Sequence, residues 1–127
     1  MRSLLLAIFI VLTAQVAVAA PNPQIEQGGR VRAIAKTLSV PANWRFIVVD
    51  EIQWKSITQK SGTTLESHSA VSNLKAGVTF IRVGYAAAAT DYLLRRTIAH
   101  EMGHARCQCT NESTADRIAD QLTQDLQ

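Results

Sequence analysis

Apolar residues recur along this chain at two spacings, which distinguish predicted helices from predicted strands. From Arg30 they follow one another three or four positions apart, as on one buried helix face, and Pro41 closes this stretch because the residue before a proline avoids helical backbone angles. The same spacing predicts a helix over 91–107, with Thr90 as its N-cap, and a last helix from Asn111 to the C-terminus. The three apolar faces comprise Val31, Ile34, Ala35 and Leu38; Leu94, Ile98, Met102 and Ala105; and Ala115, Ile118, Ala119, Leu122 and Leu126.

Strands are predicted where aromatic and β-branched residues gather, over 44–50 and 78–85. Residues 63–72 are expected to form a third strand, although their pattern is weak. Residues 51–61 are ambiguous, because apolar and polar side chains alternate there in a way that leaves a strand open. Residues 21–29 are turn-rich and are expected to form a mobile lead-in. The order of helix, strands and two final helices predicts an α+β domain with a short mixed or antiparallel sheet.

The first 19 residues have the composition of a secretory signal peptide. Arg2 provides a basic start, residues 4–18 are almost wholly apolar, and residues 17–19 have the small-x-small pattern of a cleavage site. We predict cleavage after Ala19, so that residues 20–127 form one mature domain that is secreted or periplasmic. The alternative is an uncleaved membrane anchor, for which the apolar run is shorter than the ~20 residues that a spanning helix needs.

The charge pattern argues against several partners. The chain has 13 Lys and Arg residues against 10 Asp and Glu, a formal net charge of +3. The basic residues are scattered, with Arg95 and Arg96 as the only adjacent pair, so we expect no nucleic-acid partner. No second apolar run of spanning length follows the signal peptide, so we expect no membrane contact by the mature form.

The two cysteines, Cys107 and Cys109, are separated by one residue. An exported protein meets an oxidising compartment, which favours disulfides, but a bridge between these two closes a very small loop. Three states are therefore open: a reduced pair, a strained local disulfide, or a link between two chains that makes a disulfide-bonded dimer.

The candidate chemistry lies in the predicted helix 91–107. His100 and His104 are four residues apart, so both imidazoles leave the same helix face with their Cβ atoms about 6 Å apart. At that separation two ring nitrogens can share one Zn²⁺ at ~2.0–2.1 Å each. Glu101 lies one step round the helix, where it can act as general base on a metal-bound water. Gly103 costs a helix interior about 1 kcal/mol relative to alanine, which indicates that something comes close to it, such as a neighbouring backbone.

A third zinc ligand is predicted in the last helix. Glu112 lies near the start of that helix, and a catalytic zinc takes three protein ligands with one position open to water. Asp116 follows it by four residues, on the same face, where its carboxylate can accept the free N–H of a ligand histidine.

A competing metal site uses the cysteines. His100, His104 and Cys107 fall on one helical face, and Cys109 can join them if the helix has ended, which gives a closed structural zinc site without catalysis. This interpretation leaves Glu101 and the two later carboxylates unexplained. A metal-free pseudo-enzyme that serves as a binding module is a further alternative.

The stretch HEMGH at 100–104, followed by NESTAD at 111–116, resembles the motifs of the gluzincin metallopeptidases. In that family the third zinc ligand is a glutamate on a second helix, within an N-E-x-x-x-D arrangement. The resemblance covers about 95–119, and the short chain is most similar to minimal single-domain members of the group.

The resemblance implies a zincin-like metallopeptidase domain over 20–127. Zinc would be held by His100, His104 and Glu112, and Glu101 would activate the zinc-bound water that attacks a peptide bond of a peptide or protein substrate. The strand 78–85 would be the edge strand beside the active-site helix, and the substrate would pair with its backbone.

Two features are not settled by the motif. Seven residues separate His104 from Glu112, so the helix must stop near Cys107 and turn without the help of a glycine. The group that stabilises the oxyanion lies outside the motif in gluzincins. Tyr85, Tyr92 and His68 are the candidates, and Tyr85 is preferred because it ends the predicted edge strand.

Overall fold

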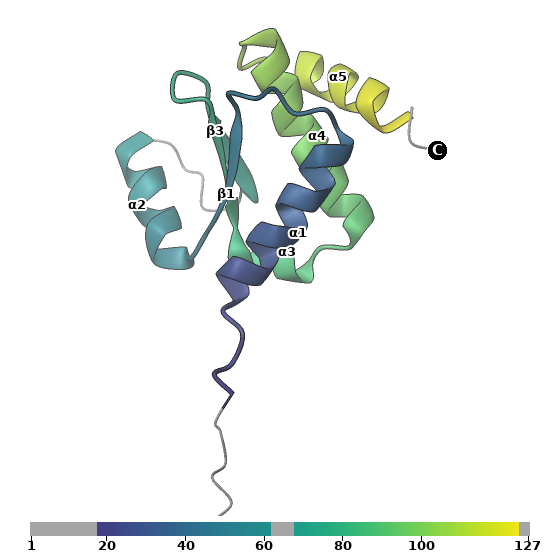
Figure 1. The fold of residues 1–127 in the computed structure, drawn as a ribbon. Helices are drawn as coiled ribbons and strands as arrows, with labels where there is room; N and C mark the ends of the chain where they lie inside the picture. The colour runs from purple at the N-terminus through teal and green to yellow at the C-terminus, as the bar shows by residue number, and fades with distance from the viewer. Residues whose placement is uncertain (1–17, 62–67, 125–127) are drawn as a thin grey trace, which may run out of the picture.

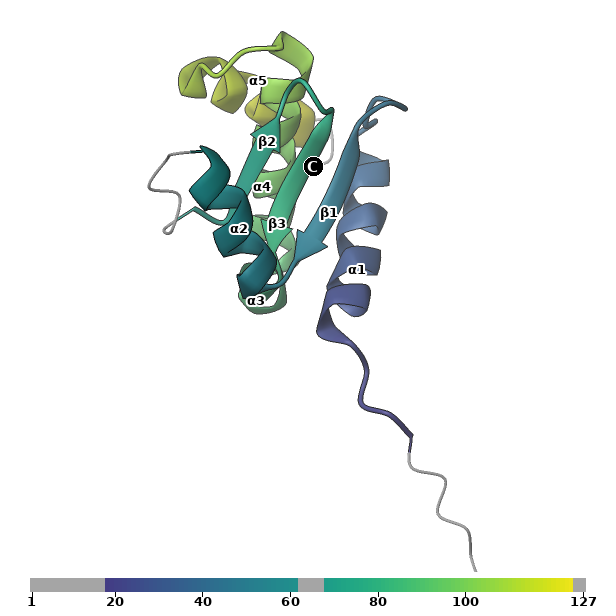
Figure 2. The ribbon, with the colours of Figure 1, turned by 90° about the vertical axis from the view of Figure 1, so that its left-hand side faces the viewer.

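The computed structural model describes residues 18–61 and 68–124. Helices cover both faces of a three-stranded sheet, with α2 on one face and α1, α3 and α4 on the other (Figures 1 and 2). The described elements, in chain order, are α1 (Pro23–Thr37), β1 (Arg45–Val49), α2 (Glu51–Ser61), β2 (Ala70–Asn73), β3 (Val78–Arg82), α3 (Val83–Ala88), α4 (Asp91–Cys107) and α5 (Glu112–Gln124). This arrangement confirms the predicted α+β class.

Parts of the sequence-based predictions lie outside the described residues. These are residues 1–17 of the predicted signal peptide, residues 63–67 of the strand expected over 63–72, and the buried position expected for Leu126. Within 18–61 and 68–124, every helix is too short or too polar to cross a membrane.

The strand order is β1-β3-β2, so β3 is the central strand. It pairs in parallel with β1 on one side and antiparallel with β2 on the other, so both of its backbone edges are occupied. The prediction that 78–85 is an edge strand is therefore wrong, and this strand also ends at Arg82, with Tyr85 in α3. The edge strand that contacts α4 is β2. Strand order depends on contacts between distant segments, so a local pattern does not reveal it.

Two helices differ from their predictions. α1 begins at Pro23, so most of the expected lead-in is helical: the Asn22 side chain accepts a hydrogen bond from the Gln24 N–H, and proline suits the first helical position. α2 occupies the ambiguous segment. Its buried side chains, Trp54 and Thr58, are four residues apart, which is a helical spacing.

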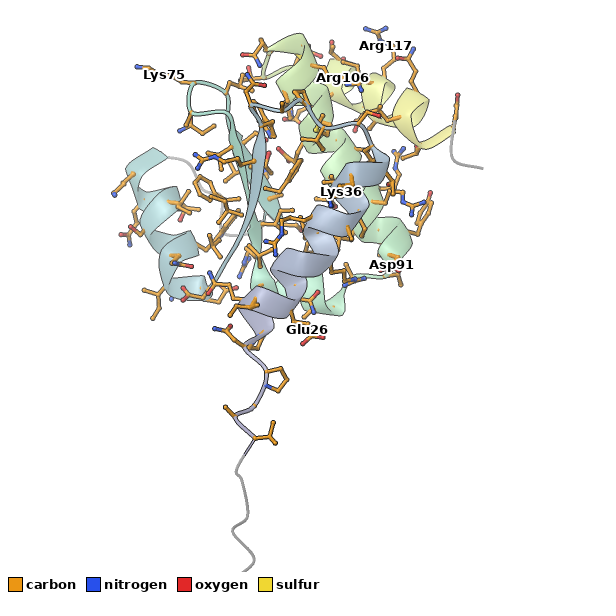
Figure 3. The ribbon with its side chains drawn as sticks, viewed as in Figure 1. Glu26, Lys36, Lys75, Asp91, Arg106 and Arg117 are labelled. Carbon is orange, nitrogen blue, oxygen red and sulfur yellow. A yellow bond between two sulfur atoms is a disulfide. The ribbon has the colours of Figure 1, made fainter. Side chains whose placement is uncertain are left out.

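The core fills the space between the sheet and the helices on the α4 side. The predicted apolar face of α4 is confirmed, since Leu94, Ile98 and Met102 have no exposed surface and Ala105 is buried. Figure 3 shows charged side chains spread over the surface of different elements, including the labelled Glu26 and Arg117. This spread agrees with the scattered charge seen in the sequence.

Arg30 connects α1 to the segment that leads into α4. Its guanidinium donates hydrogen bonds to the carbonyl oxygens of Ala86 and Ala89, and it pairs with Asp91 at 2.7 Å. The Asp91 side chain is 76% exposed, whereas that of Arg30 is 26% exposed. The carbonyl contacts should therefore matter more than the ion pair, because solvent screens an exposed pair.

We expect Arg30→Gln to lower the free energy of unfolding by about 1–3 kcal/mol, because two carbonyls lose a charged donor. Asp91→Asn should cost less than about 1 kcal/mol, since it removes only the exposed pair. Urea denaturation of both variants measures the difference. Equal losses would show that the ion pair, and not the carbonyl contacts, holds this junction.

Candidate metal centre

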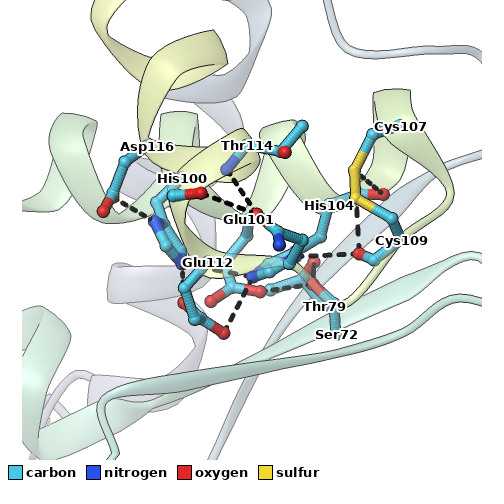
Figure 4. A network of polar contacts seen from close by, with 12 residues as sticks. Ser72, Thr79, His100, Glu101, His104, Cys107, Cys109, Glu112, Thr114 and Asp116 are labelled. Atoms are coloured by element: carbon cyan, nitrogen blue, oxygen red, sulfur yellow. Dashed lines mark hydrogen bonds and ion pairs between the residues drawn. A yellow bond between two sulfur atoms is a disulfide. The ribbon is translucent and has the colours of Figure 1, made fainter.

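Three side chains predicted as zinc ligands come together between α4 and α5. His100, His104 and Glu112 each offer one ligand atom, and these atoms lie within 4.8 Å of one another (Figure 4). The two Nε2 atoms are 3.2 Å apart, and the Glu112 carboxylate lies 2.9 Å from the His100 Nε2 and 3.4 Å from the His104 Nε2. Donor atoms that share one tetrahedral ion at ~2.0–2.1 Å lie about 3.3 Å apart. The spacing therefore fits a single zinc ion.

The hydrogen bonds at the other ring nitrogens fix the tautomers. The His100 Nδ1 faces the Asp116 carboxylate at 2.8 Å, and the His104 Nδ1 faces the Cys109 carbonyl at 2.9 Å. An ionised carboxylate and a carbonyl only accept hydrogen bonds, so each Nδ1 carries the proton. In the neutral form, each ring presents its Nε2 lone pair toward the other and toward Glu112. Three electron-pair donors of this kind, two imidazole nitrogens and a carboxylate that face one point, are a donor set that fits a divalent metal.

Asp116 therefore has the contact that the sequence predicted, with the N–H of a ligand histidine. The corresponding contact for His104 is made by a backbone carbonyl, which carries no signal in the sequence. His104 is buried and the His100 side chain is 24% exposed, whereas Glu112 is 73% exposed. The cluster is accordingly enclosed on the α4 side and open to solvent at Glu112.

A pocket of about 410 Å³ lies between β2 and α4 and reaches all three ligand residues. Glu101 also lines this pocket, although only 7% of it is exposed. Its Oε2 accepts a hydrogen bond from the Ser72 hydroxyl at 2.5 Å. Among the described residues, no hydrogen bond reaches the other carboxylate oxygen, Oε1. The predicted general base therefore lies in the same pocket as the candidate metal ligands, and its Oε2 is hydrogen bonded to Ser72.

The turn between the two helices is made by Gln108 and a disulfide. Gln108 adopts the left-handed conformation at φ 50°, and its side chain donates to the Ala105 carbonyl. Cys107 and Cys109, on either side of it, are bonded to each other within the chain, which is one of the three states expected from the sequence. The chain can therefore turn without a glycine. A disulfide sulfur is not a thiolate, so in this structure the Cys₂His₂ alternative lacks two of its four ligands.

Asn111 starts α5 and so places Glu112. Its side-chain oxygen accepts a hydrogen bond from the Thr114 N–H at 2.8 Å, and its carbonyl accepts one from the Ala115 N–H at 3.1 Å. Glu112 is the first residue of the helix, where a negative charge is favoured by the helix dipole. One turn later, Asp116 lies on the same face, toward His100.

Gly103 allows α5 to approach α4. A Cβ atom at this position would lie 2.5 Å from the Ala115 carbonyl oxygen and 2.6 Å from its Cα. Both are backbone atoms, so neither can move without moving the helix. The prediction that a neighbouring backbone lies against Gly103 is confirmed, and this contact sets the distance between the histidines and Glu112.

The three candidates for oxyanion stabilisation lie in different places. The Tyr85 hydroxyl is hydrogen bonded to Thr97, and Tyr92 is 67% exposed in the first turn of α4. His68 lines the pocket together with His100 and Glu101. The sequence analysis preferred Tyr85, whereas His68 is the candidate that lines the pocket. Ser72 was not among the residues that the sequence analysis singled out. The signal available for Ser72 was that a hydroxyl on a weakly patterned strand would lie opposite another, Thr79, once the register was known.

Compared with known proteins, the chain matches no family model, no curated protein and no solved structure. What can be inferred about function therefore depends on the residues of this cluster and their geometry.

We expect Gly103→Ala to lower the free energy of unfolding by about 1–3 kcal/mol, because the added methyl group meets backbone. Zinc affinity should also fall, since α5 must move and Glu112 moves with it. Gly29→Ala is the matched control: it lies in α1 with nothing within 4 Å of the added Cβ, and it should stabilise by up to about 1 kcal/mol. Denaturation without metal and zinc titration by calorimetry measure the two effects. Unchanged zinc affinity in Gly103→Ala would contradict the role given to this contact.

We expect Asp116→Ala to weaken zinc binding about 10–100-fold, because the His100 ring loses the acceptor that fixes its orientation and tautomer. Asp120→Ala, one turn further along α5, is the control. Asp120 accepts a hydrogen bond from Arg96, which raises the pKa of that guanidinium, and it does not contact the histidines among the described residues. Competition with a chromogenic chelator gives both affinities. A similar loss in the two variants would indicate a general effect of charge on this helix.

Proposed function

We propose that this chain is an exported zinc-dependent metallopeptidase of gluzincin type that hydrolyses peptide bonds. The observation that carries the proposal is the convergence of the His100, His104 and Glu112 donor atoms, with the Glu101 carboxylate beside them in one pocket. A zinc ion held there would supply Lewis-acid polarisation of a peptide carbonyl and a lowered pKa of bound water.

Each residue of the cluster has a distinct task in this proposal. His100, His104 and Glu112 bind the metal, while Asp116 keeps the His100 ring in the required tautomer. Glu101 accepts the proton of the attacking water at its Oε1 and returns it to the nitrogen of the leaving amine. Its near-complete burial limits the contact of this carboxylate with bulk water.

The substrate would bind along β2. Among the described strands, β2 is paired on one side only, and its residues line the pocket together with α4. An extended peptide can add to such an edge through backbone hydrogen bonds. This assignment replaces the predicted pairing with 78–85, whose edges are both occupied. His68, at the start of the same segment, is the candidate that could contact the substrate carbonyl.

Export remains part of the proposal on two grounds. Residues 1–19 have the pattern of a cleaved signal peptide, and the Cys107–Cys109 disulfide suits an oxidising compartment. The mature protein would then act in the periplasm or outside the cell on peptide or protein substrates.

The decisive variant is Glu101→Gln, which removes the proton acceptor but keeps the shape of the side chain. We expect cleavage of a fluorogenic peptide library to fall at least about 100-fold, with zinc still bound, because general base catalysis contributes that much. Glu26→Gln, an exposed change in the first turn of α1, should leave the rate unchanged. Cleavage that survives in zinc-loaded Glu101→Gln would rule out the role given to this carboxylate.

A further inference from the structure

A chain of hydrogen bonds runs from the protein core to Glu101. The Trp44 indole Nε1 donates to the Thr79 hydroxyl oxygen at 3.0 Å. Thr79 and Ser72 are joined through their hydroxyls at 2.7 Å, and Ser72 donates to the Glu101 Oε2 (Figure 4). Trp44, Thr79 and Glu101 are all buried. Trp44, Thr79 and Ser72 belong to none of the motifs that the sequence analysis identified.

The chemistry of the end groups fixes the direction of every bond. An indole N–H only donates, so the Thr79 oxygen accepts at one end, and an ionised carboxylate only accepts, so Ser72 gives its proton at the other. Ser72 has a single proton, which is used on Glu101. The bond between the two hydroxyls must therefore run from Thr79 to Ser72. Each hydroxyl has one possible orientation, and all protons point toward Glu101.

The fold also fixes the positions of the donors. Ser72 on β2 and Thr79 on β3 are opposite each other in the antiparallel register, so their side chains meet across the strands. Thr79 lies on the central strand with no exposed surface. The Ser72 hydroxyl is therefore held by the sheet, independently of α4, on which Glu101 lies.

We propose that Ser72 is a positioning residue for Glu101: it holds Oε2 and so directs Oε1 toward the water that attacks the substrate. The proposal rests on the proposed function, because Glu101 is the proton acceptor in it. Without Ser72, the carboxylate could rotate, and the fraction of molecules with Oε1 in place would fall. Ser72 does not touch substrate or metal in this role.

Ser72→Ala should lower kcat at least about tenfold, as expected for the loss of a hydrogen bond to a charged group. KM and zinc affinity should change less than about twofold, because Ser72 contacts neither the substrate nor the metal in this proposal. Ser72→Thr keeps the hydroxyl and should recover kcat to within about threefold. Ser56→Ala, an exposed serine on α2, is the matched control and should match the parent protein. A rise in KM with unchanged kcat, or a failure of Ser72→Thr to recover activity, would overturn the proposal.

The double variant separates action through Glu101 from a general structural effect. In a Glu101→Gln background, Ser72→Ala should change the residual rate less than about twofold, because coupled residues are not additive. A further tenfold loss would show that Ser72 acts by another route.

A crystal structure of the zinc-loaded Ser72→Ala protein gives a readout that does not depend on activity. We expect the Glu101 carboxylate in one conformer in the parent protein and rotated or in several conformers in the variant. A Glu101 carboxylate unmoved in Ser72→Ala would overturn the positioning role. If the parent protein binds zinc but cleaves no peptide, the proposed function fails, and the positioning of Glu101 is then decided by this comparison alone.

Discussion

The contact on which the site depends is the approach of α5 to α4 at Gly103. The proposed metal ligands come from two helices, and their donor atoms can meet only if the helix backbones come close. A side chain at Gly103 would overlap the backbone of Ala115. The other residues of α5 have fixed positions once this contact is made. Glu112 then faces the two imidazoles and Asp116 faces the outer nitrogen of His100. Gly103 costs the helix some stability, but its small size allows Glu112 to reach the two histidines as the proposed third ligand.

The features that the sequence predicted are those that depend on spacing within one element. Helix α4 and its apolar face follow from a long 3.6-residue period, and the histidine pair follows from a spacing of four. The start of α1 was readable from Asn22 and Pro23, a cap followed by proline, but the glycines after them obscured it. The segment that forms α2 is short, and its apolar residues fitted both the two-residue period of a strand and the spacing of a helix. Strand order and the Ser72–Thr79 pair require contacts between distant segments, which no local pattern contains.

The turn between the helices explains how a short spacing still brings Glu112 to the histidines. Gln108 takes the left-handed conformation that glycine usually occupies, and the flanking cysteines are bonded across it. The same turn places the Cys109 carbonyl against His104. One local structure therefore reverses the chain and orients the His104 ring. The cysteines, which first suggested a competing metal site, instead support the histidine and carboxylate set.

In the proposed enzyme, strand β2 would link substrate binding to the position of the proton acceptor, Glu101. Its backbone lies in the plane of the sheet, with one edge open among the described strands, while the Ser72 side chain stands out of that plane toward Glu101. A peptide paired with the open edge would therefore leave the Ser72 contact intact and would reduce the motion of the strand that carries it. Longer peptides, which pair over more of β2, would then hold Glu101 more firmly. In the proposed enzyme, binding energy from residues remote from the cleaved bond would raise kcat as well as lower KM.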